Sequence, residues 1–140
     1  TLTENGLNLI RMLPANTVLV TCIASIGKNA ILRSKGGCNQ QINAVIPNNE
    51  NVAEFLYYLF EASKHYLLSS AGTTATSIVS KANVGEMTFT VPPLPEQTAI
   101  AEVLTDMDAE LATLEQRREK TRLLKQAMMQ ELLTGRTRLV

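Results

Sequence analysis

The longest uninterrupted pattern in the sequence runs from Pro92 to Gly135, and nothing inside it breaks a helix after Pro95. Pro95 suits the first helical turn, where a missing N–H costs nothing, and Gly135 supplies the usual C-terminal stop. Acidic residues gather in the first half of this stretch and basic residues in the second, which complements the helix dipole. At 1.5 Å per residue, we expect a helix of about 55–60 Å.

Apolar residues in this helix follow the alternating four-and-three spacing of a coiled-coil seam. Arg118 and Lys125 interrupt the seam in its middle, and we assign them no role. A helix with one long apolar stripe cannot bury it alone, so we expect a partner helix from another chain or segment. The alternative is a helix folded along its own domain. The seam residues are Ile100, Leu104, Met107, Leu111, Leu114, Met128 and Leu132.

Ahead of the helix, three short stretches rich in β-branched or apolar residues predict strands at 16–23, 30–33 and 42–46. The tight connection around Gly27 predicts a hairpin between the first two. Residues 86–91 alternate apolar and polar side chains and predict a further, half-buried strand.

Residues 52–68 carry apolar side chains at helical spacing and predict a core-facing helix, with Asn51 as its N-cap. Residues 69–77 are rich in small and hydroxyl side chains and predict a loop. The expected fold class is therefore α+β: a small mixed β-sheet with a packed helix, followed by a long C-terminal coiled-coil helix. We divide the chain into residues 1–93 and 94–140.

Composition adds few constraints. The chain has 140 residues and no formal net charge, and no stretch has the length or apolarity of a membrane span or a signal peptide. Cys22 and Cys38 lack a CxxC or Cys/His ligand spacing, so we expect reduced cytosolic thiols in the core. The chain begins at Thr1, which indicates a processed piece or a fragment.

The distribution of charge is more informative than its sum. No acidic residue occurs between Glu4 and Glu50, whereas four basic residues fall there, which predicts a local basic surface. An amide cluster follows, and side-chain amides can read adenine in a DNA major groove. Such clusters also stabilise turns or form buried networks. The candidate DNA-binding residues are Lys28, Arg33, Lys35, Asn39, Gln40, Gln41, Thr73 and Thr74.

No catalytic or metal site is predicted. His65 is the only histidine, and no cysteine or carboxylate is positioned to orient it. The glycine spacing around Ser25–Lys28 is not that of a phosphate-binding P-loop. The carboxylates of the long helix lie on its solvent faces, so they are not an acid/base pair. We expect no cofactor bound to this chain.

Several segments, taken together, resemble the C-terminal part of the DNA-specificity subunit of type I restriction–modification systems. The proline-rich step, with the helix that closes on Leu-Leu-Thr-Gly, is the most specific part of the resemblance. The matching segments are TVLVTCIASIG at Thr17–Gly27, NQQI at Asn39–Ile42, the GTT loop at Gly72–Thr74, PPLPEQ at Pro92–Gln97, and LLTGR at Leu132–Arg136.

The resemblance implies a cytoplasmic, non-catalytic target-recognition domain for double-stranded DNA, truncated at its N-terminus, joined to a conserved spacer helix. In such subunits two recognition domains each read half of a split target, and two long helices pack antiparallel. The implied partners are modification subunits that methylate adenine with S-adenosylmethionine and restriction subunits that use ATP and Mg²⁺. The sequence agrees, since it lacks methyltransferase, Walker and nuclease motifs.

This chain holds one domain and one spacer, where a complete subunit has two of each. We therefore expect a homodimer through the exposed seam. The resemblance does not name base-reading residues, so the candidates above rest on their chemistry and position. The alternative function is a coiled-coil dimerisation or protein-interaction module that does not bind DNA.

Overall fold

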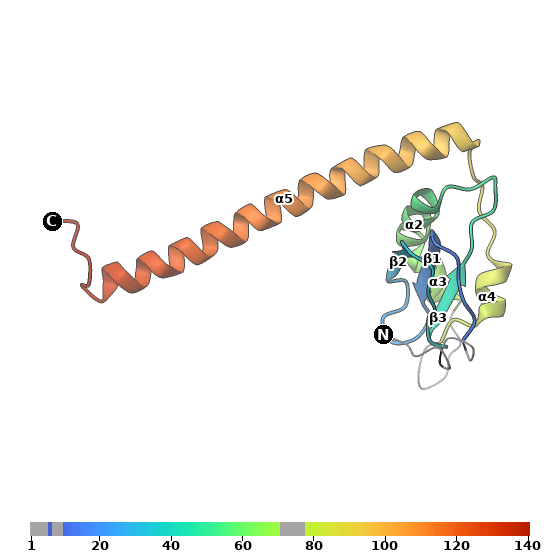
Figure 1. The fold of residues 1–140 in the computed structure, drawn as a ribbon, viewed down its shortest axis with the longest axis horizontal. Coiled ribbons are helices and arrows are strands. Elements are labelled where there is room, and N and C mark those ends of the chain that lie inside the picture. Colours follow the sequence, from blue (N-terminus) through green and yellow to red (C-terminus); the bar gives the residue numbers. More distant parts are fainter. Residues whose placement is uncertain (1–5, 7–9, 71–77) are drawn as a thin grey trace. The chain divides into compact units, whose positions relative to one another are not determined.

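The computed structural model describes Gly6 and residues 10–70 and 78–140 (Figure 1). The chain divides into two compact units, a head unit (Thr1–Glu102) and an arm unit (Val103–Val140). The described elements are β1 (Thr17–Thr21), β2 (Asn29–Leu32), β3 (Ile42–Val45), α2 (Ala53–Ala62), α3 (Lys64–Ser69), α4 (Lys81–Glu86) and α5 (Leu94–Leu133).

The head unit is built on a three-stranded sheet in the order β2-β1-β3. β1 pairs antiparallel with both neighbours, with Val18 opposite Ile31 of β2 and Val45 of β3. The three strands predicted at 16–23, 30–33 and 42–46 are confirmed, with the hairpin between the first two, and so is the α+β class. The sheet itself is antiparallel instead of mixed, because β1 lies between β2 and β3 and runs opposite to both of them.

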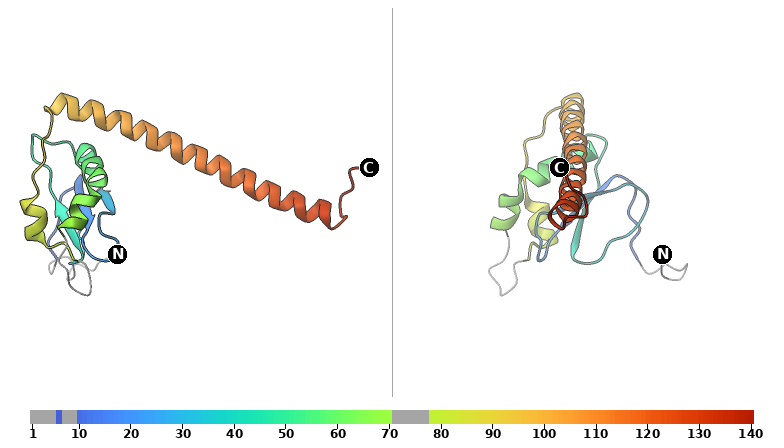
Figure 2. Two further views of the ribbon diagram at one scale, coloured as in Figure 1. Left: turned by 180° about the vertical axis from the view of Figure 1, so that it is seen from behind. Right: turned by 90° about the vertical axis from the view of Figure 1, so that its left-hand side faces the viewer.

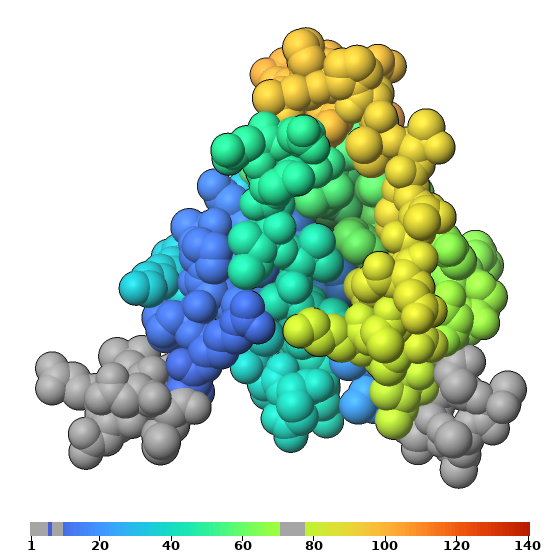
Figure 3. Space-filling view, turned by 90° about the vertical axis from the view of Figure 1, so that its right-hand side faces the viewer, coloured from blue at the N-terminus to red at the C-terminus, as the bar shows by residue number. Residues whose placement is uncertain are grey.

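Alternate residues of β1 build the core. Val18 and Val20 are at most 1% exposed and pack with Phe55, Leu56 and Phe60 of α2. Figure 3 shows the edge of the head unit where β3, in teal, lies between the blue N-terminal residues and the yellow-green and yellow residues that follow position 77. β3 is an edge strand, because the sheet order places β1 on one side of it and no strand on the other.

The helix predicted over 52–68 is two helices, because Ser63 leaves helical geometry between α2 and α3, with φ −92° and ψ 16°. The serine hydroxyl can form hydrogen bonds with nearby backbone groups in non-helical conformations, which favours a break in the helix at Ser63. The predicted N-cap was also wrong. Val52 is the cap residue, and Asn51 instead donates a side-chain hydrogen bond to Asn48 Oδ1 (2.6 Å).

The strand predicted over 86–91 was wrong, since Glu86 ends α4 and the residues after it pair with no strand. Their alternation reflects packing alone. The Phe89 ring contacts Phe60 and Tyr66 edge to face, at centroid distances of 5.6 and 6.0 Å. Alternation at the surface of a core thus mimicked the period of a strand.

Gln97, in the second turn of α5, fastens the start of this helix to the head unit. Its side chain is 1% exposed. Its Nε2 donates to the carbonyl oxygens of Glu50 and Pro92 (both 2.9 Å), and its Oε1 accepts from the Val52 N–H (3.1 Å). A residue of α5 therefore caps the N-terminus of α2.

α5 has 40 residues. Two further views show it as one continuous helix (Figure 2). At 1.5 Å per residue it is about 60 Å long, and Gly135, at φ +72°, follows its end. The predicted long helix and its stop are confirmed. The first turns of α5 belong to the head unit, and the domain division at residues 93 and 94 stays a prediction.

Candidate nucleic-acid interface

One end of the sheet brings together several of the predicted site residues. The Thr21 N–H donates to the Lys28 carbonyl (2.9 Å), and the Cys22 N–H donates to the Gln41 carbonyl (3.0 Å). The connection from β1 to β2 and the start of β3 therefore meet where β1 ends. We call this the turn end of the sheet, formed by Lys28, Asn39, Gln40, Gln41 and, as shown below, Lys64.

Hydrogen bonds from the Thr21 side chain stabilise the turn that presents Lys28. Thr21 Oγ1 accepts from the Lys28 N–H (3.0 Å) and lies 3.1 Å from the Lys28 carbonyl, to which it donates. Gly27 has φ +80°, a left-handed conformation that favours glycine. Because these constraints fix the backbone on both sides of Lys28, its exposed side chain leaves from a defined position.

Lys64, at the start of α3, was missed by the sequence analysis. A Cβ added to Gly27 would lie 2.8 Å from Lys64 Cγ, so the lysine stem packs directly on the glycine. This contact places a second exposed lysine beside Lys28. In the sequence, the one feature that could have indicated Lys64 is its place just after Ser63, a residue that favours the break between α2 and α3.

The amide cluster divides between structural and exposed roles. Asn39 Oδ1 accepts from the Gln41 N–H (3.0 Å), and the Asn39 carbonyl accepts from the Ile42 N–H (3.2 Å). Asn39 thus builds the turn before β3, in the way we gave as the alternative for the cluster. Gln40 and Gln41 are exposed, and their side chains are available to a ligand.

Arg33 lies at the opposite end of β2 from Lys28. Its Nη1 forms an ion pair with Glu54 Oε1 of α2, and this hydrogen bond holds the pKa of the Glu54 carboxyl below its ordinary value. Lys35 lies on the connection that returns toward β3, next to Gly36, which pairs with Leu13. Neither residue shares the turn end. Thr73 and Thr74 lie outside the described residues.

The two cysteines differ. Cys22 is buried, its Sγ–H donates to the Gln41 carbonyl (2.9 Å), and burial raises the pKa of its thiol. Cys38 is exposed, so the expectation of a core thiol was wrong for this residue. It precedes the Asn39 turn, where the chain lies at the surface of the sheet. Both thiols are free.

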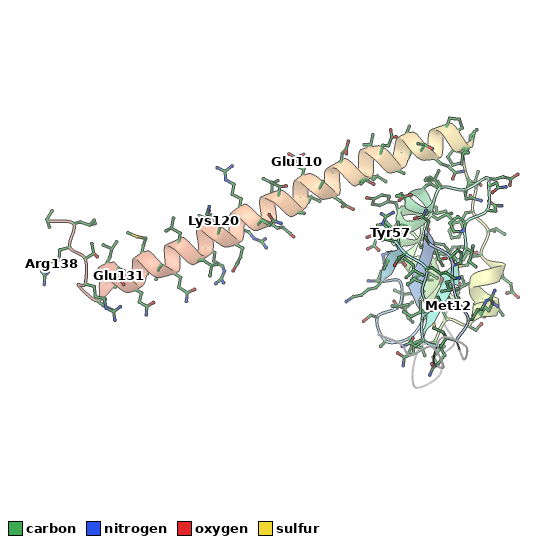
Figure 4. The ribbon with its side chains drawn as sticks, viewed as in Figure 1. Met12, Tyr57, Glu110, Lys120, Glu131 and Arg138 are labelled. Carbon is green, nitrogen blue, oxygen red and sulfur yellow. The ribbon has the colours of Figure 1, made fainter. Side chains whose placement is uncertain are left out.

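The seam residues of α5 are exposed in the described part of the chain. Met107, Leu111 and Leu114 are 55%, 57% and 52% exposed, and the buried residues of α5 are Gln97 and Ala101. Figure 4 labels Glu110 and Lys120, one from the acidic and one from the basic half of the helix. Near the polar interruption, Arg122 makes two hydrogen bonds of 2.8 Å to the Glu119 carboxylate.

Within Gly6, 10–70 and 78–140, no cluster of three or more histidine, cysteine or carboxylate side chains could hold a metal ion. In the same residues, no helix has the length and apolarity to cross a membrane.

Comparisons with known proteins agree on one family. A family model described as a type I restriction modification DNA specificity domain matches residues 11–124. A specificity subunit of the type I restriction enzyme MjaIX, from Methanocaldococcus jannaschii, is 33% identical over 101 residues. This match covers 71% of the chain and 23% of the relative, so the chain spans about a quarter of that protein's length.

Solved structures share the fold. A chain from a structure of complex assembly and conformational transition of the type I R-M system has a TM-score of 0.72 at 18% identity. The match covers 86% of this chain and 31% of that chain. The type I restriction–modification S subunit from M. genitalium has a TM-score of 0.65 at 24% identity. This match covers 87% of this chain and 33% of that chain.

Proposed function

Because the chain belongs to the type I restriction modification DNA specificity family, we propose that it recognises double-stranded DNA as part of a specificity subunit. The observation that supports a DNA-reading surface is the turn end of the sheet. It combines the exposed lysines Lys28 and Lys64 with the exposed amides of Gln40 and Gln41.

These side chains have complementary chemistry toward a duplex. Lysine ammonium groups hold phosphates and carry the salt-dependent part of the affinity, whereas glutamine amides can bond both edges of an adenine. Lys28 and Lys64 therefore position the DNA, and Gln40 and Gln41 contribute to sequence preference. Arg33 and Lys35, away from this end, contribute at most to the general basic field. Thr73 and Thr74 remain candidates for phosphate contacts.

Binding of the complete subunit, with its modification partner, to duplexes selected from a random library tests this assignment. Lys28→Ala should weaken binding to target and scrambled duplexes alike and reduce the slope of log K against log salt by about 1. Gln41→Ala should change which duplexes are selected. Arg33→Ala is the matched control at the opposite end of the sheet, and an equal effect of both cation replacements would contradict the turn end as the footprint.

α5 is, in this proposal, a spacer and assembly arm that packs against a matching antiparallel helix. Its exposed seam needs a partner, and its charge pattern favours the antiparallel direction. Between residues 94 and 116 all charged side chains are acidic, whereas Arg117, Arg118, Lys120, Arg122 and Lys125 follow. In an antiparallel pair, the acidic half of one helix lies beside the basic half of the other.

For this chain by itself, the partner helix is that of a second copy. Sedimentation of the isolated chain should give a dimer, and Leu111→Asp should give a monomer because it places a charge in the seam. Glu110→Ala, beside the seam, is the control that should stay dimeric. A monomeric parent chain would contradict the homodimer.

The remaining assignments follow from the specificity-subunit role. The protein is non-catalytic and works in the cytoplasm with modification and restriction subunits. S-adenosylmethionine, ATP and Mg²⁺ then belong to those subunits. The alternative, a dimerisation module without DNA binding, would be favoured if neither the parent nor its Lys28 and Gln41 variants bound any duplex.

A further inference from the structure

β3 has an unpaired outer edge. The register pairs Val20 with Asn43 and Val18 with Val45, and the Cys22 N–H bonds the Gln41 carbonyl. Antiparallel neighbours alternate between bonded and non-bonded pairs, so Asn43 and Val45 direct their backbone groups to β1. The N–H and C=O of Ala44 therefore point away from the sheet, and no described residue bonds them.

A groove runs beside this edge. Its volume is about 740 Å³, within the range of ligand sites, and it is bounded by β3, α2, α4 and residues 87–91. Figure 3 looks onto this face, with the hollow lying between the teal residues of β3 and the yellow residues after α4. The apolar lining includes Ile46, Leu59, Phe60, Val84, Met87 and Phe89.

The charged side chains that line the groove are both basic. Arg11 and Lys81 belong to the lining, and no acidic residue does. Neither cation forms an ion pair with any residue in the described ranges. An occupant that suits the groove therefore offers apolar side chains and at least one carboxylate.

We propose that this β3 groove binds an extended, apolar protein segment that carries a carboxylate and adds to the sheet as a strand beside β3. Ala44 supplies the backbone donor and acceptor, and alternate side chains of the segment enter the apolar lining. The carboxylate pairs with Arg11 or Lys81. Nucleic acid suits the groove less well, because its walls are mainly apolar and the backbone edge is complementary to a peptide.

An exposed strand edge next to an apolar groove favours aggregation when no other segment covers it. Proteins commonly protect such edges with charges, prolines, bulges or a covering segment. β3 carries neither proline nor charge, and its sequence is Ile-Asn-Ala-Val. A covering segment is therefore the protection that this edge lacks within the described chain.

The complete chain can be titrated with the peptide VTVTDTVTV-amide, labelled with fluorescein at its N-terminus and followed by fluorescence anisotropy. Its central Asp lies on the same face of the strand as its valines. We expect saturable binding, and protection of the Ala44 amide from hydrogen exchange on binding. The same peptide with its central Asp replaced by Pro should bind at least about tenfold more weakly, since it lacks a backbone donor and the carboxylate. Equal binding of both peptides, or no saturable binding, would overturn the proposal.

Two variants separate the backbone from the charge contribution. Ala44→Pro removes an outward N–H without touching the bonds to β1, a position where edge strands tolerate proline, and should abolish binding. Lys81→Glu should weaken binding of the Asp peptide and strengthen binding of a peptide with Lys in its place. Lys120→Glu, on α5, is the matched control. Displacement of the peptide by scrambled duplex DNA would overturn the assignment of a protein occupant.

Discussion

Replacing Gln97 tests the connection between α5 and the head unit. Gln97→Ala leaves the Val52 N–H and the carbonyls of Glu50 and Pro92 without their partner, in a site where the side chain is 1% exposed. At about 1 kcal/mol for each hydrogen bond, the free energy of unfolding of the head unit should fall by about 3 kcal/mol. With an m-value of about 2 kcal/mol per M urea, the midpoint falls by about 1.5 M.

The assay can observe the head unit alone. All three tyrosines, Tyr57, Tyr58 and Tyr66, lie in the head unit, so tyrosine fluorescence follows its unfolding, whereas far-UV circular dichroism mainly follows α5. Gln116→Ala, at an exposed site of the same helix, is the control and should change stability by less than about 0.5 kcal/mol. A fluorescence midpoint that moves no further for Gln97→Ala than for this control would refute the reasoning.

A second replacement at this position separates the role of the Gln97 amide nitrogen, which donates, from that of its amide oxygen, which accepts. Gln97→Glu keeps an oxygen for the Val52 N–H but turns a carboxylate toward two carbonyl oxygens. Burial and these oxygens both favour the neutral acid in the folded state, so the pKa of the new carboxyl rises on folding. The variant should therefore be least stable at neutral pH and should recover stability as the pH falls.

Three further predictions concern the head unit. Arg33→Ala should lower the free energy of unfolding by less than about 1 kcal/mol at neutral pH, because its ion pair with Glu54 is exposed. Since Arg33 lowers the pKa of the Glu54 carboxyl, this loss should vanish as the pH falls through that pKa. Lys35→Ala should show no such pH dependence in urea titrations. Iodoacetamide followed by mass spectrometry should label Cys38 quickly and Cys22 only on unfolding, and equal rates would contradict the burial of Cys22. Gly27→Ala should cost about 1–3 kcal/mol through its positive φ and its contact with Lys64, whereas Gly85→Ala, with open space around it, should cost nothing measurable by thermal unfolding.

Local patterns in the sequence were sufficient for the elements that depend on local interactions. The long helix was predictable because proline, glycine and charge mark its ends, and the three strands because β-branched runs stand between turn residues. The turn end of the sheet was predicted only in part, because the sequence indicated Lys28 and Gln41 but not Lys64. Their neighbour Lys64 comes from a separate helix, and its contact with Gly27 is a tertiary one that no local spacing reveals.

The errors share a physical cause. Asn51 is a good N-cap by residue type, but Val52 is the cap residue, and its N–H donates to Oε1 of Gln97, 45 residues away. Residues 87–91 alternate because the core lies on one side of them, with Phe89 against Phe60, and not because they pair with a strand. In both cases a long-range contact replaced the local rule that the sequence obeyed.

The cap on α2 also has a consequence for the order of events during folding. The chain is made from its N-terminus, so α2 emerges before the glutamine that completes its first turn. A contact over 45 residues closes late, and long-range contacts slow folding because their loop entropy is lost before they are formed. The head unit should therefore complete its folding only after Gln97, in the first part of α5, has been synthesised.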